Sequence, residues 1–218
     1  MKLISLLGAI VLLSTGCAKQ MTKHQAYPGM YEEKPEAVLV IPAINKSTAA
    51  DAPILYSSTI NEPLSNAGFY VLPIEVTNRI LQNEGLSNGD ALKNIPPQKF
   101  AEHFGADAVL YVTINQWDTN YYVIGGNVQV GVDFQMKSCK TGANLWTYSN
   151  LLTIDTSGDA NSGGLLGAII ATAIATAGQD YVPIASRLNT IALTAIPFGK
   201  YHKMHEHDKS MIVNVSEK

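Results

Sequence analysis

An alternation of apolar and polar residues over positions 127–136 constrains the fold of this chain most strongly. A period of two is typical of a β-strand with one buried and one solvent-facing side, because successive side chains point to opposite faces of a sheet. A Gly-Gly turn at 125–126 follows a long strand expected over 107–120, and a turn at 140–143 leads into a further strand over 144–155. The sequence therefore predicts an antiparallel meander. The apolar positions of the alternation are Val128, Val130, Val132, Phe134 and Met136.

The region before the meander alternates between strand and helix patterns. We expect a buried strand over 37–41, a helix over 51–67, a strand over 69–72, a helix over 75–84 and a short helix from Pro96. Together with the meander, these units predict an α/β (α+β) domain whose mixed sheet carries helices mainly on one face. The core-facing side chains expected on the two longer helices are Ile54, Ile60, Leu64, Ala67, Val76, Ile80 and Leu81.

The start of the chain has the layout of a bacterial lipoprotein signal. Residues 1–16 combine a basic start at Lys2 with an uncharged apolar stretch and small residues before the cleavage point. Cys17 at the junction predicts cleavage before it and acylation, since an ordinary signal needs no cysteine there and a membrane span needs about 20 apolar residues. Ser14 departs from the usual Leu of this motif. Ala18, where inner-membrane lipoproteins carry Asp, resembles the pattern of export to the outer membrane.

These patterns divide the chain into four segments. They are a signal peptide (1–16), a polar lipidated tether (17–36), a single periplasmic α/β domain (37–200) and a polar, histidine-containing tail (201–218). Hydrophobic content of 46% with 15% charged residues favours a well-packed globular chain. The lack of a basic tract argues against nucleic acid as a partner. Cys139 has no intramolecular partner once the first cysteine is acylated, so we expect it to be buried or paired between chains.

A second apolar stretch covers residues 163–178 and carries no charge. It is shorter than a membrane span and poor in large apolar side chains. Its small residues, Gly163, Gly167, Ala171 and Ala175, would let a helix approach another helix or a sheet closely. Three interpretations stay open: a core helix, a helix at the interface of a homodimer, and a membrane-inserting segment.

No constellation of reactive residues is present in the sequence. The chain contains no nucleophile elbow, no paired histidines of a zinc protease and no phosphate loop, so we predict a protein that is not an enzyme and has no cofactor. His202, His205 and His207 have a spacing that suits zinc or copper, but a solvated tail is favoured because a metal site requires fixed ligand geometry. His103 is expected at the surface.

Three aromatic residues are candidate contacts for a protein partner. Trp117, Tyr121 and Tyr122 cluster towards the end of the first long strand. Tyr and Trp are favoured at binding surfaces because they bury a large area with little loss of rotamer freedom. The alternative, which the pattern favours, is that these rings cover the open end of the core.

Several segments resemble a known family. Residues 63–73 (PLSNAGFYVLP), residues 140–146 (KTGANLW) and the small-residue stretch 163–178 are similar to a family of uncharacterised Gram-negative lipoproteins that includes a meningococcal antigen candidate. The similarity covers roughly residues 30–205. The order of elements also resembles the amino-terminal domain of TolB and the periplasmic domain of the curli secretion lipoprotein. The resemblance implies a lipid-anchored domain facing the periplasm, and it implies no catalytic residues.

The favoured function is a non-catalytic protein-interaction component of envelope assembly or secretion. Such a protein would be anchored in the outer membrane and would work beside an envelope partner, for which the resemblance suggests a curli-type secretion lipoprotein. The alternative is a ligand-binding auxiliary of an envelope transporter, which requires an apolar pocket with a few convergent polar groups. A hydrolase assembled from distant residues, with His103 beside a carboxylate and a hydroxyl, is the least favoured function.

Overall fold

The computed structural model describes residues 19–122, 125–155 and 181–215. These residues form a mixed six-stranded sheet with the order β4-β2-β5-β6-β7, and β3 also pairs with β5. The strands are β2 (Ala37–Val40), β3 (Ile44–Asn45), β4 (Tyr70–Val71), β5 (Ala108–Tyr122), β6 (Gly125–Ser138) and β7 (Asn144–Asp155). β2 pairs in parallel with β4 and β5, whereas β5, β6 and β7 form an antiparallel meander. The predicted fold class is confirmed.

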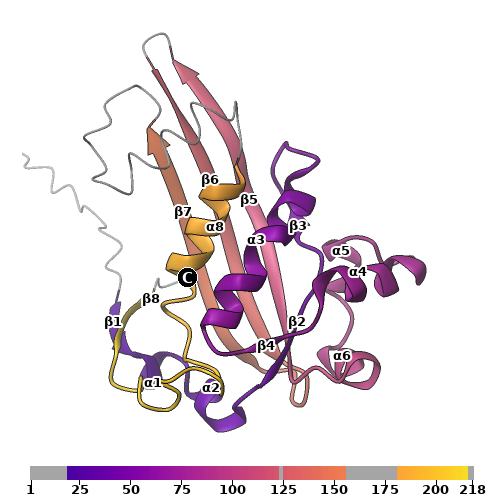
Figure 1. Ribbon diagram of the computed structural model, residues 1–218, viewed down its shortest axis with the longest axis vertical. Coiled ribbons are helices and arrows are strands. Elements are labelled where there is room, and N and C mark those ends of the chain that lie inside the picture. The colour runs from indigo at the N-terminus through magenta and orange to yellow at the C-terminus, as the bar shows by residue number, and fades with distance from the viewer. Residues whose placement is uncertain (1–18, 123–124, 156–180, 216–218) are drawn as a thin grey trace, which may run out of the picture.

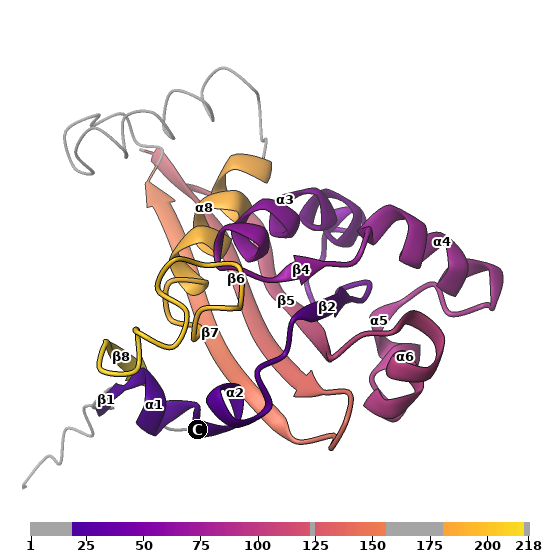
Figure 2. The same cartoon turned by 60° about the horizontal axis from the view of Figure 1, so that its bottom comes forward.

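Helices cover the two faces of this sheet unequally. α3 (Ala52–Asn66) and α8 (Val182–Ala192) lie side by side on one face (Figures 1 and 2). α5 (Gly89–Leu92) and α6 (Pro97–Phe104) pack on the opposite face, over β2 and the first part of β5. α4 (Ile74–Asn83) reaches both layers, because Ile74 belongs to the first core and Leu81 to the second. The two longest of these five helices therefore share one face, the two shortest lie on the other, and α4 contacts both layers.

Side-chain alternation along the strands divides the core between these two layers. On β5, Leu110 and Val112 face α3 and α8, whereas Val109 and Tyr111 face the layer of α5 and α6. On β6, the apolar positions of the 127–136 alternation are all buried in the α3 and α8 layer, as predicted. Trp146 of β7 packs with them. The period of two therefore located the larger core correctly.

The expected inward faces of α3 and α4 are partly wrong. α3 buries Tyr56, Ile60 and Leu64, which are spaced four residues apart and lie on one stripe. Ile54 lies outside this stripe and is 76% exposed. On α4, the inward stripe is Ile74, Thr77 and Leu81. The spacing of that stripe turns Val76 and Ile80 towards solvent, where both are exposed.

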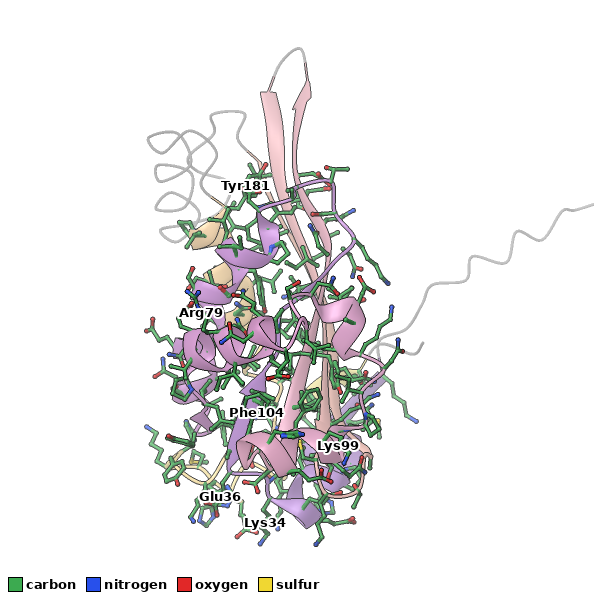
Figure 3. The ribbon with its side chains drawn as sticks, turned by 90° about the vertical axis from the view of Figure 1, so that its right-hand side faces the viewer. Lys34, Glu36, Arg79, Lys99, Phe104 and Tyr181 are labelled. Atoms are coloured by element: carbon green, nitrogen blue, oxygen red, sulfur yellow. The ribbon has the colours of Figure 1, made fainter. Side chains whose placement is uncertain are left out.

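The two ends of the described chain pack against each other, which corrects the predicted tether and tail. β1 (Lys19–Thr22) pairs antiparallel with β8 (Ile212–Val215). α1 (Lys23–Ala26) and α2 (Pro28–Glu33) follow β1, and Tyr27 and Met30 enter the larger core. Two ion pairs at 2.7 Å, Lys34 with Glu206 and Lys200 with Glu36, add further links between the two segments. Lys34 and Glu36 are marked in Figure 3. The segments 17–36 and 201–218 are therefore integral to the domain where they are described.

A buried ion pair joins these ends. The ammonium of Lys23 lies 3.2 Å from Asp208 Oδ2 and donates to the carbonyl of Ile196 at 2.6 Å. Tyr31 donates its hydroxyl to Asp208 Oδ1 at 3.1 Å, and the backbone N–H of Phe198 donates to Asp208 Oδ2 at 2.9 Å. Both charged side chains are almost fully buried, at 1% and 0% exposure. Burial lowers the pKa of Lys23, and the carboxylate opposes that effect. We call these five residues the Lys23–Asp208 cluster.

Within the described ranges, no helix has the length and apolar character that crossing a membrane requires. The stretch 163–178 and the signal segment 1–16 lie outside the described residues. The three interpretations of residues 163–178 therefore stay predictions.

Candidate functional site

A groove of about 280 Å³ lies between α3 and α4 at the end of β2. Prolines lie at the ends of the elements around the groove. Pro42 follows β2, Pro53 lies in the first turn of α3, and Pro73 immediately precedes α4. Proline suits a helix start because its fixed φ matches the helix and its missing N–H would have no partner there. The α3–α4 groove is lined by Pro53, Ile54, Ser57, Glu75, Asn78 and Arg79, among others.

The apolar part of the groove has a buried floor and an exposed rim. Val40 and Ile60 line it from the core and are buried. Ile54 stands at the rim with 76% of its surface exposed. Covering such a side chain removes apolar surface from water, which stabilises a complex by about 25 cal/mol per Å². The groove thus offers an apolar contact that the domain itself does not use.

Polar groups in the groove also lack partners. The side-chain oxygen of Asn78 is buried and accepts no hydrogen bond from any residue that the structure describes. Such an unsatisfied oxygen costs about 1–3 kcal/mol of stability. Arg79 forms no ion pair with the described residues. Arg79 belongs to α4 and lies well away from Lys99 of α6 (Figure 3). The groove can therefore take a negative charge beside Arg79, next to the apolar side chain of Ile54.

This groove was not predicted from the sequence. Its residues come from three separate elements, and nothing in their spacing along the chain shows that they meet. The one available signal was the position of Ile54, two residues before Tyr56 on the buried stripe of α3. Helical geometry places residues two positions apart on nearly opposite sides, so a buried Tyr56 implies an exposed Ile54.

The aromatic residues proposed as partner contacts have a different environment. Trp117 is buried at 2% exposure and stacks on Tyr181, with 5.3 Å between the ring centroids. Trp117 therefore packs in the core, in line with the alternative that the sequence pattern favours, and is not an exposed partner contact. The backbones of Tyr121 and Tyr122 belong to β5. Their side chains lie outside the described residues.

The three histidines near the C-terminus do not meet as a metal site. His202 stacks on Phe198 at 3.8 Å between ring centroids, and its Nδ1 accepts the backbone N–H of Met204. The Nδ1 of His205 lies 2.8 Å from the carbonyl oxygen of Phe198. Burial, together with the cations of Lys203 and Lys23, lowers the pKa of His202. Over the described ranges, no three metal-ligating side chains come together.

The structure describes one of the two cysteines, Cys139. Cys139 is buried at 1% exposure, which agrees with one of its two predicted states. Burial raises the pKa of its thiol to about 12, so the thiolate needed for disulfide chemistry is scarce at neutral pH. Cys17 lies outside the described residues, and its acylation stays a prediction.

Comparison with known proteins identifies the family. The family model described as "Putative lipoprotein GNA1162-like" matches residues 25–196. The lipoprotein NMB1124/NMB1162 of Neisseria meningitidis serogroup B is 31% identical over 166 residues, 76% of each chain. The crystal structure of lipoprotein GNA1162 from Neisseria meningitidis is 26% identical to this chain, with a TM-score of 0.55. The match covers 67% of this chain and 100% of that one. A PelC dodecamer from Paraburkholderia phytofirmans is more distant, with 18% identity and a TM-score of 0.46, over 75% of this chain and 88% of that one. That likeness is too weak to transfer the assembly to this chain. The family match over 25–196 and the relative at 31% identity place this protein in the GNA1162-like family of lipoproteins.

Proposed function

We propose that this protein is an outer-membrane lipoprotein, acylated at Cys17 and facing the periplasm, that binds another envelope protein through the α3–α4 groove. Its role is non-catalytic and belongs to envelope assembly or secretion, with a curli-type secretion lipoprotein as the first partner to test. Membership of a lipoprotein family supports the anchor. The open groove supports the interaction.

The position of the groove relative to the predicted lipid carries this proposal. Lys19, the first residue of β1, follows Cys17 by two positions. Two extended residues span at most about 7 Å, so an acylated Cys17 would hold the β1–β8 end of the domain close to the membrane. α4 lies on the opposite side of the molecule from β1 and β8 (Figures 1 and 2). The groove beside α4 would then face the periplasm.

The chemistry of the groove indicates what the partner presents. Ile54 is exposed and favours an apolar side chain on the partner. The cation of Arg79 favours a carboxylate nearby, whereas Glu75 disfavours one on its own side of the groove. A protein segment with an apolar anchor and an acidic residue meets these conditions.

The anchor is tested by growth with labelled palmitate. The wild-type chain should incorporate label and fractionate with the outer membrane. Cys17→Ser should carry no label and appear in the soluble periplasm. A labelled Cys17→Ser chain, or an unlabelled wild-type chain, would contradict the proposed anchor.

The interaction is tested by a photo-crosslinking amino acid placed at Ile54 in intact cells. Leu151 of β7 is a control position, because it is also apolar and exposed, at 52% against 76% for Ile54, but lies outside the groove. We expect an adduct with another envelope protein from position 54 and a much lower yield from position 151. Equal yields at both positions, or no adduct from position 54, would contradict a binding groove.

A ligand-binding auxiliary of a transporter is the second candidate function. The groove combines an apolar floor with polar groups, and its volume of about 280 Å³ lies just below the usual range of small-molecule sites. A small molecule retained through native purification, with no protein adduct from position 54, would favour this candidate. The hydrolase alternative has less support, since His103 is exposed and does not line the groove.

A further inference from the structure

The C-terminal segment 201–212 carries a large share of the exposed apolar side chains. Four of the nine large apolar side chains that are exposed in the described residues belong to it, namely Tyr201, Met204, Met211 and Ile212. Figures 1 and 2 show this segment, in yellow, at the same end of the molecule as β1 and α1. Exposed apolar side chains that gather in one segment indicate a contact surface.

Strand pairing fixes how Ile212 is presented. Ile212 pairs with Thr22 of β1, and the Lys23 N–H donates to the carbonyl of Met211 at 2.8 Å. The next residue, Val213, is buried in the larger core. Because successive strand residues point to opposite faces, Ile212 points away from the domain, and 61% of its surface is exposed. The pairing therefore holds an apolar side chain outward in a defined position.

The same pairing places this side chain close to the predicted lipid. The residues that share its outward face are Gln20, Thr22, Ile212 and Asn214, which we call the ribbon face. Thr22 follows Cys17 by five positions, and five extended residues span at most about 18 Å. An acylated Cys17 would thus keep the ribbon face within reach of the lipid headgroups. This short tether favours a lipid bilayer over a protein as the occupant of the face.

The charges around the ribbon face favour an anionic bilayer. Lys19 begins β1, is exposed and forms no ion pair with any described residue. Lys209 lies 4.0 Å from Glu206, whose carboxylate already pairs with Lys34 at 2.7 Å. Glu32 of the neighbouring α2 is an exposed carboxylate that opposes them. Lysines beside exposed apolar side chains are typical of surfaces that lie in a membrane interface.

We propose that the ribbon face lies on an anionic phospholipid bilayer, with Ile212 in the interface and Lys19 and Lys209 at the headgroups. The proposal rests on the acylation of Cys17 in the proposed function and adds the orientation of the domain. Acyl chains hold a protein on a membrane, but the two positions between Cys17 and β1 leave the domain free to turn. A second contact at the ribbon face would hold α4 and its groove towards the periplasm.

The contact is tested on the acylated chain in vesicles of phosphatidylethanolamine and phosphatidylglycerol. A cysteine that carries a polarity-sensitive fluorophore replaces Asn214 on the ribbon face or Asn83 at the end of α4, both of which are exposed. Cys139 is buried and Cys17 is acylated, so the new thiol is labelled selectively. A nitroxide-bearing lipid should quench position 214 several-fold more than position 83, and aqueous iodide should do the reverse.

Two pairs of substitutions separate the apolar and the charged contributions, with quenching at position 214 as the measure. Ile212→Ser should lower the ratio of docked to undocked domains about tenfold, whereas Val76→Ser, at 59% exposure against 61%, should leave it unchanged. Lys19→Gln should lower the ratio about fivefold. Lys46→Gln changes an exposed lysine directly after β3, which also forms no ion pair with a described residue, and should have no effect.

Flotation with the vesicles reports the anchor separately from the surface. A chain that does not float would contradict the acylation of Cys17, and the contact proposed on that basis would fall with it. A chain that floats but shows equal quenching at positions 214 and 83, or equal effects within either pair of substitutions, would overturn the ribbon-face contact alone. Protection of position 214 from both quenchers would indicate that a second copy of the chain covers the face, which would also overturn the lipid contact.

Discussion

The Lys23–Asp208 cluster and the α3–α4 groove differ in how well their polar groups are satisfied. In the cluster, both Asp208 oxygens accept hydrogen bonds, and the Lys23 ammonium has two oxygen partners and the face of Phe198. In the groove, the buried oxygen of Asn78 and the cation of Arg79 have no such partners among the described residues. A buried polar group that is fully satisfied stabilises one arrangement of the chain. A buried group left unsatisfied costs stability. An exposed charge without an ion-pair partner, such as Arg79, is available to a ligand.

The comparison predicts where substitutions damage folding and where they damage binding. Substitutions in satisfied clusters should lower the free energy of unfolding. Those at exposed residues of the groove should leave it nearly unchanged and affect binding instead.

The largest expected effect is that of Asp208→Ala. It leaves the Lys23 charge buried without its counter-ion, and it removes the acceptor of the Tyr31 hydroxyl and the Phe198 N–H. Breaking a buried ion pair in this way costs about 3–5 kcal/mol. Urea unfolding followed by circular dichroism measures the loss. Glu36→Ala breaks the exposed pair with Lys200 and should leave the midpoint nearly unchanged. Equal shifts of the urea midpoint for Asp208→Ala and Glu36→Ala would contradict the claim that the buried cluster stabilises the domain more than the exposed ion pair does.

The next effect distinguishes two tyrosine hydroxyls. Tyr56 donates to Asn189 at 2.7 Å, and Asn189 donates to Thr59 at 2.9 Å, which links α3 to α8. Tyr56→Phe leaves the buried Asn189 oxygen without this donor and should cost about 1–3 kcal/mol. Tyr111→Phe, which removes a hydroxyl without a partner, should be neutral or stabilising. Thermal unfolding of both variants checks this pair, and a larger loss in Tyr111→Phe would contradict the account.

Alkaline pH should lower the free energy of unfolding because the thiol of Cys139 is buried. Its pKa is raised from 9.0 to about 12 by burial, so between these values the unfolded chain loses a proton that the folded chain keeps. Stability is then fully present below pH 9 and falls as pH rises towards 12, by up to about 1.4 kcal/mol per pH unit for one proton. Cys139→Ala should reduce this slope in urea unfolding between pH 9 and pH 10.5. An unchanged slope would show that the thiol does not contribute.

The smallest effect on folding is expected in the groove. Ile54→Ser and Arg79→Glu change exposed side chains, so each should alter the free energy of unfolding by less than about 0.5 kcal/mol. Urea midpoints measure the change, with Ile60→Ser as the matched control because Ile60 is fully buried on the same helix. Strong destabilisation by Ile54→Ser would indicate that Ile54 has a structural role.

The sequence predicted the parts of the fold that depend on local pattern. The 127–136 alternation and the turn at 140–143 specify the β6–β7 hairpin, because the period of two and the turn residues act over short distances. Lys23 and Asp208 are 185 positions apart, and no local pattern shows that a charge in a polar segment will be buried with a partner so distant. The predicted tether and tail were wrong for this reason.

The candidate site was harder to predict than the fold. Ile54, Val76 and Ile80 are apolar and were assigned to the core, but helix geometry places them off the buried stripes. An apolar residue on the surface has the same sequence signal as one in the core. Asn78 and Arg79 resemble ordinary polar residues of a helix, and only the structure shows the missing partner of one and the groove beside the other.

The most direct test of the central claim is the yield of the envelope-protein adduct from a photo-crosslinker at Ile54 in chains that also carry Arg79→Glu. Lys99→Glu provides the same charge reversal on α6, outside the groove. If the groove binds the partner, Arg79→Glu should lower the adduct yield about tenfold or more, as expected for a lost charge pair at an interface, and Lys99→Glu should leave it unchanged. An undiminished yield in the Arg79→Glu chain, or an equal fall in both, would contradict the claim that the open groove is the binding site.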